Sequence, residues 1–126
     1  MKYIELFEDH IDELSSYEKK CHFATIYLEK IQPITEEDGF VECLYGDIDP
    51  NHLLLISFYY KDWISEDSNE KICDFFDKNK LKIHGDVIYN QKHHLDEYII
   101  KLSKYQLNKY SKLGEIMNTS KKYNVI

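Results

Sequence analysis

Carboxylates are concentrated in one short stretch of the chain, where they could recognise a positively charged partner. Residues 62–77 carry six acidic side chains and a single lysine. The ordinary interpretation of such a run is a solvated helix face. The alternative is a surface that attracts a basic protein, since a field of one sign selects partners of the opposite charge. The acidic residues are Asp62, Glu66, Asp67, Glu70, Asp74 and Asp77.

A second candidate site combines an anionic group with an aromatic ring. Asp86 and Tyr89 lie three positions apart, and the neighbouring Gly85 and Asn90 predict an exposed turn. Tyrosine supplies a rigid contact area with a hydrogen-bonding tip, so it is common in binding surfaces. The pair is therefore a chemically sensible hot spot for a partner rich in Lys or Arg.

Metal or catalytic chemistry has weaker support. His93, His94, Asp96 and Glu97 are the most metal-like cluster, because His93 and Glu97 would share one side of a helix. A zinc site needs three or four convergent ligands, and no second pair with suitable spacing is evident. No nucleophile elbow, P-loop or glycine-rich phosphate motif is present. We expect no enzymatic activity, no catalytic residue, no metal and no cofactor.

Length and composition favour one helical domain. The 126 residues are enough for a single domain, 1–126, with its own core. Only 4 Gly and 2 Pro punctuate the chain, whereas an all-β protein of this size needs many turns. No apolar run reaches the ~18 residues of a membrane span, and the charged start is no signal peptide, so we expect a cytoplasmic protein. Three widely spaced cysteines predict buried free thiols rather than disulfides: Cys21, Cys43 and Cys73.

Charge is divided unevenly along the chain. Residues 1–77 hold 19 acidic residues and 6 lysines, whereas residues 78–126 hold 4 acidic residues and 10 lysines. The larger acidic part would repel duplex nucleic acid and attract a basic protein. All 16 basic residues are lysines, so the chain has no arginine for bidentate recognition of phosphate or carboxylate.

The remaining elements must be built around the apolar stretch Asp49–Ile64. Apolar residues occur on every face of this segment, so it is either a central helix or a central strand. Asp49 followed by Pro50 is typical of a helix start, and we prefer the helix. The alternative is a hairpin of Phe40–Tyr45 with Leu53–Tyr60, which the β-branched and aromatic content favours.

Helical periodicity predicts most of the other elements. We expect amphipathic helices over residues 3–15 and Tyr17–Ile31, and a helix start at Thr35–Asp38. Ser68 would cap a further helix whose core face is Ile72, Phe75 and Phe76. A long helix is expected over His93–Tyr110. The predicted fold is all-α, a bundle of five to six helices. The alternative is α+β, with a small sheet from 40–45, 53–60 and 82–89.

The segment His84–Asn90 resembles the short third-helix motif of the immunity proteins that neutralise nuclease bacteriocins of the colicin and pyocin type. The likeness covers residues 52–110: an aromatic-rich segment, the acidic stretch 66–77, the motif and a closing helix. Asn90 stands where that family usually has a second Tyr, and residues 1–50 have no counterpart. The resemblance implies that Asp86 and Tyr89 bind the toxin, with looser counterparts at Glu66, Glu70, Asp74 and Asp77.

These observations lead to one leading functional prediction. We expect an acidic binding inhibitor, an immunity protein that captures a basic toxin domain and contacts neither nucleic acid nor membrane. The first alternative is a nucleic-acid mimic that blocks a defence or restriction nuclease with the same carboxylates. The second is a metal-dependent enzyme that uses His93, His94 and Glu97.

Overall fold

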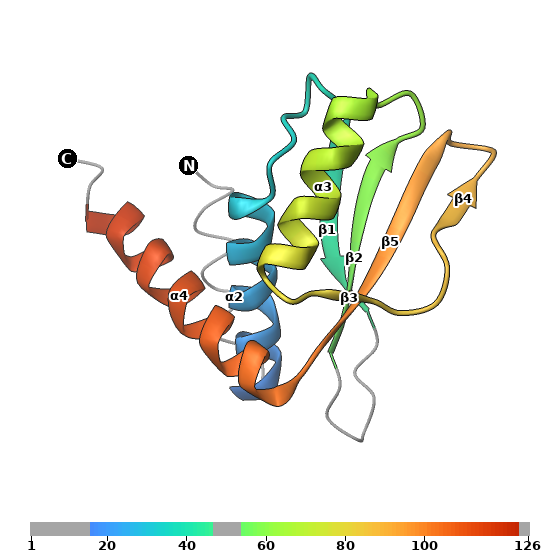
Figure 1. Ribbon diagram of the computed structural model, residues 1–126. Coiled ribbons are helices and arrows are strands. Elements are labelled where there is room, and N and C mark those ends of the chain that lie inside the picture. The colour runs from blue at the N-terminus through green and yellow to red at the C-terminus, as the bar shows by residue number, and fades with distance from the viewer. Residues whose placement is uncertain (1–15, 47–53, 124–126) are drawn as a thin grey trace.

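The computed structural model describes residues 16–46 and 54–123, and shows a sheet of five strands with three helices packed beside it (Figure 1). In chain order the elements are α2 (Ser16–Ile31), β1 (Phe40–Tyr45), β2 (Leu54–Lys61), α3 (Glu66–Lys78), β3 (Lys82–Ile83), β4 (Ile88–Asn90), β5 (Leu95–Leu102) and α4 (Lys104–Tyr123).

Every strand pairing in the sheet is antiparallel. The two long strands β2 and β5 lie side by side over eight residue pairs, from Leu54 opposite Leu102 to Lys61 opposite Leu95. β1 pairs with the other side of β2, with an irregularity in the register between Phe40 and Glu42. The short strands β3 and β4 both pair with β5, so they form the opposite edge of the sheet.

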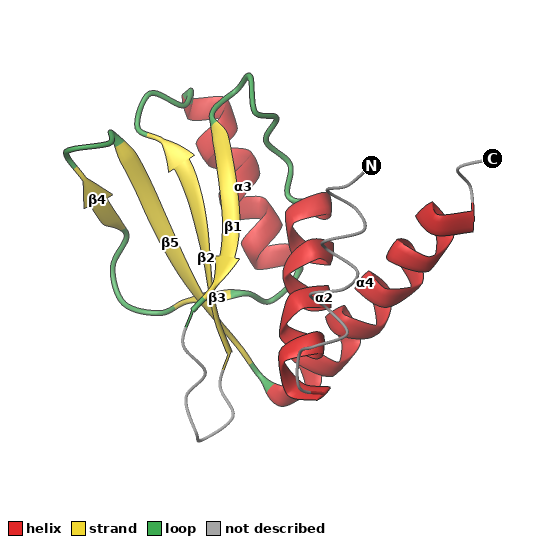
Figure 2. Cartoon of the chain, turned by 180° about the vertical axis from the view of Figure 1, so that it is seen from behind, coloured by secondary structure: helices red, strands yellow, loops and turns green. Residues whose placement is uncertain are grey.

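One face of the sheet supplies the core. Alternate residues of β2 are fully buried, as expected for a strand with one covered face. α3 covers this face, because Phe75 and Phe76 make ring contacts with Phe58. Seen from behind, the sheet lies in front of α3, and none of the described helices crosses that second face (Figure 2). The buried residues of the long strands are Leu54, Ile56, Phe58, Tyr60, Tyr98, Ile100 and Leu102.

Local sequence explains how the helices begin and pack. Ser65 caps α3, since its side chain accepts a hydrogen bond from the Ser68 amide. α2 and α4 pack closely at Gly114, where a Cβ atom would overlap the carbonyl oxygen of Phe23. No helix in the described part of the chain is both long and apolar enough to span a bilayer.

The predicted all-α bundle is wrong, and the fold is α+β. The expected central helix Asp49–Ile64 contains β2 instead, and its first residues, 49–53, lie outside the described part. Alternation decides this segment: even-numbered residues from Leu54 to Tyr60 are buried, and odd-numbered ones are half-exposed. A period of two is compatible with a strand and not with a helix. The hairpin weighed as the alternative is close to what forms.

Three further expectations are corrected. The predicted helix His93–Tyr110 is divided into β5 and α4, with the break at Ser103. Thr35–Asp38 starts a turn rather than a helix. The motif segment 84–90 is a bend followed by strand β4, so the short helix implied by the immunity-protein resemblance is absent there.

Other predictions hold. The helix expected over Tyr17–Ile31 forms as α2, and the core face of Ile72, Phe75 and Phe76 is buried, although Ser65 and not Ser68 caps its helix. The helix expected over residues 3–15 lies outside the described residues.

Candidate functional site

The predicted acidic residues form one exposed face of α3. Glu66, Glu70, Asp74 and Asp77 follow one another at helical steps of four, four and three, so they share one side of the helix. That side is opposite the buried residues Ile72, Phe75 and Phe76. Within the described part of the chain, none of these four carboxylates forms an ion pair or a side-chain hydrogen bond with another residue. We call these four residues the acidic face.

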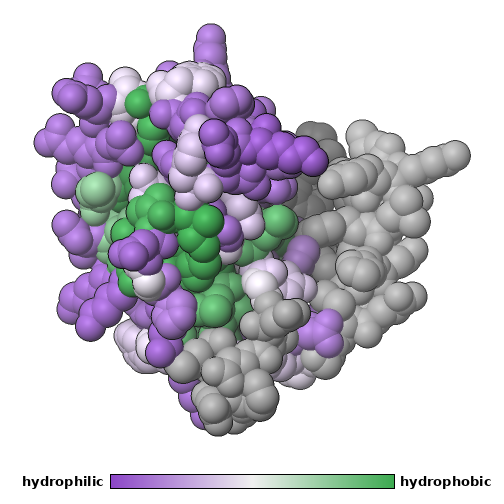
Figure 3. Space-filling view, turned by 90° about the vertical axis from the view of Figure 1, so that its right-hand side faces the viewer, coloured by the Kyte–Doolittle hydropathy of each residue, from purple (hydrophilic) through white to green (hydrophobic). Residues whose placement is uncertain are grey.

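The predicted Asp86–Tyr89 segment is also exposed, and it is more apolar than expected. Val87, Ile88 and Tyr89 are 43%, 47% and 51% exposed, and Ile83 in β3 is exposed as well. Figure 3 shows apolar side chains gathered in the middle of the side of the molecule that carries β4, with polar side chains around them. We call Asp86–Tyr89, which leads into β4 and includes its first two residues, the β4 segment. A contiguous exposed apolar surface with a polar rim is typical of an interaction site.

Tyr89 is held in place by residues from two other turns. Its hydroxyl lies 3.1 Å from Oδ2 of Asp62, to which it donates, and 3.4 Å from Nδ1 of His94. His94 Nδ1 also lies 3.4 Å from the same Asp62 oxygen. The turns themselves are joined, because the Asp62 amide donates to the carbonyl of His94 over 2.9 Å. The tip of Tyr89 is thus fixed while half of the side chain stays exposed.

The electrostatics of this cluster point to positioning rather than catalysis. The hydrogen bond to Asp62 raises the pKa of Tyr89 further above neutral pH, so the phenol stays protonated there, as that of an ordinary tyrosine does. Burial, together with the charge of Asp62, raises the pKa of the Asp96 carboxyl. A protonated phenol with a fixed hydroxyl supplies a preorganised ring for a contact, and it is not a base or nucleophile.

The two predicted groups do not come together in one site. α3 packs on β2 and β5, where Phe76 contacts the rings of Phe58 and Tyr98. β4 pairs with the outer side of β5, at the edge of the sheet (Figure 1). No hydrogen bond or ion pair among the described residues joins the acidic face to the β4 segment. A partner in contact with Tyr89 would therefore interact with the acidic face only through its long-range electrostatic field.

The residues considered for metal binding are separated. Glu97 accepts a hydrogen bond from the hydroxyl of Tyr59, His94 approaches Asp62, and the His93 amide donates to the side chain of Asn90. The expectation that His93 and Glu97 share a helix side is wrong, because His93 is in a turn and Glu97 is in β5. Among the residues described, no three His, Cys, Asp or Glu side chains are grouped as metal ligands would be.

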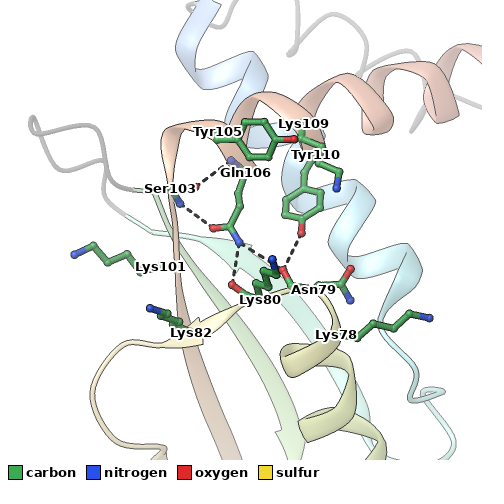
Figure 4. Close-up of a pocket in the computed structure, with 10 residues that line it drawn as sticks. All are labelled: Lys78, Asn79, Lys80, Lys82, Lys101, Ser103, Tyr105, Gln106, Lys109 and Tyr110. Carbon is green, nitrogen blue, oxygen red and sulfur yellow. Dashed lines mark hydrogen bonds between the residues drawn. The ribbon is translucent and has the colours of Figure 1, made fainter.

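Sequence reasoning missed a cavity of about 730 Å³ between the end of α3 and the start of α4 (Figure 4). The available signals were the excess of lysine after residue 78 and the alternating lysines at 78, 80 and 82. The cavity also needs residues from β5 and α4, which the predicted helix His93–Tyr110 placed differently. The lining residues are Lys78, Asn79, Lys80, Lys82, Lys101, Ser103, Tyr105, Gln106, Lys109 and Tyr110.

Comparison with protein-family models, with curated proteins and with solved structures finds no match for this chain. The resemblance of residues 84–90 to the immunity-protein motif therefore stays a prediction from sequence.

Proposed function

We propose that this protein is a cytoplasmic binding inhibitor that captures a basic protein, as an immunity protein captures a toxin domain. The observation that carries the proposal is the β4 segment, where Val87, Ile88 and Tyr89 are exposed in sequence next to Asp86. Exposing three large apolar or aromatic side chains in a row is unfavourable for an isolated surface, and a partner would cover them. Asp86 supplies a negative charge beside the apolar contact.

The proposed mechanism has two stages. The acidic face of α3 first raises the local concentration of a basic partner, because charges act over a Debye length of ~8 Å at physiological salt. The β4 segment then makes the close contact. Asp62 and His94 hold the hydroxyl of Tyr89, so less conformational freedom is lost on binding than for a free side chain.

The test of the anchor uses Tyr89→Ala and Asp86→Ala with inactive forms of basic, toxin-like domains chosen from the products of genes that neighbour this chain's gene. We expect Tyr89→Ala to weaken binding by ~2–4 kcal/mol, mainly through faster dissociation. Asp86→Ala is expected to lose about 2–5 kcal/mol if it meets a buried cation. Neither variant should lower the melting temperature much, because both side chains are exposed. Tyr105→Ala is the matched control, since Tyr105 is 75% exposed on α4 and lies outside the β4 segment.

The test of steering reverses three charges of the acidic face: Glu66→Lys, Glu70→Lys and Asp74→Lys together. We expect slower association and a flatter dependence of the association rate on salt. The control changes net charge equally at three exposed glutamates on α2, β1 and α4: Glu29→Lys, Glu42→Lys and Glu115→Lys. Equal slowing in both triple variants would assign the effect to net charge and remove the acidic face from the mechanism.

A nucleic-acid mimic remains the second candidate, because the acidic face repeats a carboxylate about every 6 Å along α3 at a rise of 1.5 Å per residue. A mimic depends on those charges and not on Tyr89. The same variants separate the two functions: binding lost on charge reversal but kept in Tyr89→Ala would favour mimicry. A Tyr89→Ala protein that melts early yet still binds would contradict the anchor.

A further inference from the structure

The lysine-lined cavity is formed by four segments that meet at one end of the sheet. Its walls come from the end of α3, from β3, from the last residues of β5 and from the first two turns of α4 (Figure 4). Five of its ten lining residues are lysines, and none of the ten is acidic. At neutral pH these five side chains carry positive charge. The cavity is thus a concentrated positive field in a chain whose net charge is −7.

The frame of the cavity is rigid because its polar groups bond one another. Gln106 Nε2 donates to the Lys80 carbonyl over 2.9 Å, and the Tyr110 hydroxyl donates to the Asn79 carbonyl over 3.2 Å. Ser103 and Gln106 form a reciprocal cap at the start of α4, each side chain accepting from the other residue's amide. These bonds join the α3–β3 loop to α4, so the lysines project from a fixed backbone.

Lys80 occupies a backbone position that suits glycine. The amide of Leu81 donates to Phe76 and that of Lys80 to Asp77, the pattern of a Schellman helix end. The residue after the cap is left-handed in this motif, and Lys80 has φ of 55°. A side chain is unfavourable there, and glycine is the usual solution. A lysine therefore occupies a strained position that lines the cavity, and such strain often occurs at functional sites.

Two further lysines of the cavity are directly opposed across the sheet. In the β3–β5 register, Lys82 lies opposite Lys101. Like charges directly opposite one another destabilise an antiparallel pair. The cavity therefore contains two independent features that oppose folding, and a bound anion would offset the repulsion between Lys82 and Lys101. Local conflict of this kind is expected where function, and not stability, determines the residue.

We infer that the cavity binds a small ligand with two or more adjacent phosphate groups. Its volume is within the ~300–1,000 Å³ usual for small-molecule sites. Phosphate is an anion that lysines suit, and Lys82 and Lys101 extend from neighbouring strands toward the same side (Figure 4). The N-terminus of the 20-residue helix α4 adds its positive dipole end. The exposed ring of Tyr105 at the rim would stack on a base if the ligand is a nucleotide. This inference is independent of the proposed inhibitor function, which uses other surfaces.

The site offers lysines and no arginine, which determines how it would recognise phosphate. Lysine binds phosphate as a point charge and not as a bidentate fork, so it neutralises charge without fixing one geometry. Affinity should therefore fall steeply with added salt, and it should follow the number of phosphates more than the rest of the ligand.

The experiment is calorimetric titration of the full chain at low salt with two probes, ATP and inorganic tripolyphosphate. Saturable binding of both probes is expected. Lys80→Gly is expected to weaken binding several-fold while the melting temperature stays the same or rises, because glycine relieves the left-handed strain. Lys82→Gln with Lys101→Gln should weaken binding roughly tenfold or more, without loss of stability. The control pair Lys30→Gln and Lys92→Gln removes the same charge at exposed positions outside the cavity and should bind like the wild type.

The Tyr105→Ala variant, titrated with each probe, shows whether the ligand is a nucleotide or an inorganic polyphosphate. If Tyr105→Ala weakens ATP and leaves tripolyphosphate unchanged, the ligand is a nucleotide; if it changes neither, the phosphates alone are recognised. No saturable binding of either probe would overturn the inference. So would equal weakening in the cavity pair and the control pair, or tight binding of a single-stranded oligonucleotide in the absence of binding to both small probes.

Discussion

The acidic face of α3 and the lysine cavity at the end of the same helix are built in different ways. The acidic face belongs to one helix and follows its local preferences: Ser65 caps it, acidic residues occupy its first turn, and its carboxylates point to solvent. The cavity takes residues from four segments, and two of its features, left-handed Lys80 and the opposed Lys82 and Lys101, contradict local preferences.

Charged surfaces that agree with local preferences and charged surfaces that oppose them have different physical causes. A surface that agrees with local preferences requires no functional explanation, because solvation alone maintains it. A surface that opposes them needs a compensating interaction, since a native sequence is otherwise consistent across levels. Solvation alone therefore accounts for the charges of the acidic face, and the inhibitor proposal depends on the β4 segment for its specificity.

Cysteine reactivity should show the largest contrast between the acidic face and the interior. Cys73 is exposed on α3 beside Asp74, whereas Cys21 and Cys43 are buried. Burial raises the pKa of Cys21 to about 11 and raises that of Cys43 as well, so both stay protonated thiols at neutral pH. We expect iodoacetamide to modify Cys73 at least ~1,000-fold faster, because the other two require global unfolding. The expectation that all three thiols are buried is wrong for Cys73.

The same thiol distinguishes the two surfaces in complexes. A basic partner that covers the acidic face should slow the alkylation of Cys73, whereas ATP or tripolyphosphate in the cavity should leave its rate unchanged. Mass spectrometry of timed samples gives both rates. Slowing by tripolyphosphate would show that the two surfaces are not separate.

Disrupting the docking of α4 should remove the cavity together with much of the stability. A side chain at Gly114 would overlap the carbonyl oxygen of Phe23, so α2 and α4 would have to separate. We expect Gly114→Val to lower the free energy of unfolding by about 2–4 kcal/mol, measured by urea denaturation. Gly46→Val is the control, because a Cβ there meets only ordinary contact distances. Equal effects in the two variants would contradict close packing at Gly114.

The helix caps offer a matched pair of smaller perturbations. The side chain of Ser65 accepts from Ser68 at the start of α3, and that of Ser103 accepts from Gln106 at the start of α4, each over 3.1 Å. Replacing either serine by alanine should lower stability by ~1 kcal/mol. Only Ser103→Ala should also weaken tripolyphosphate binding, since Ser103 lines the cavity. Weaker binding in Ser65→Ala would attribute the loss to stability alone.

The comparison also explains what the sequence could predict. The acidic face was predictable because residues 66–77 carry a clear helical period, which one segment determines by itself. The α4 cap was visible as Ser103 with Gln106 three residues later, a capping-box pattern, but the apolar period around it concealed the break. Leu95, Tyr98, Ile99 and Leu102 fit a helix, whereas Tyr98, Ile100 and Leu102 fit a strand.

Pairing decided between those two periods. Leu95–Leu102 becomes β5 because β2 offers eight matched partners and α3 covers the alternate side chains. No local pattern encodes that choice, since short apolar runs suit either structure until tertiary contacts form. The cavity follows from the same pairing: Lys101 meets Lys82 only once β5 exists. The β4 segment was found as an exposed site, but its support depends on Asp62, which lies 27 residues from Tyr89 in sequence, as well as on the nearby His94.

The smallest expected effect on stability comes from a group of glutamates away from the cavity, where like charges lie close together. Burial, with the nearby charges of Glu42 and Glu36, raises the pKa of Glu29 on α2. Because the folded state then holds this proton more readily than the unfolded state, stability falls as pH rises through the range between the ordinary and the raised pKa. Glu29→Gln should remove that loss. The gain at pH 7 is expected to stay below ~0.5 kcal/mol, because Glu29 is desolvated only on its packed side and solvent screens the rest of the side chain, and to vanish near pH 4. Urea midpoints at the two pH values measure it. A gain that persists at pH 4 would show that charge is not its cause.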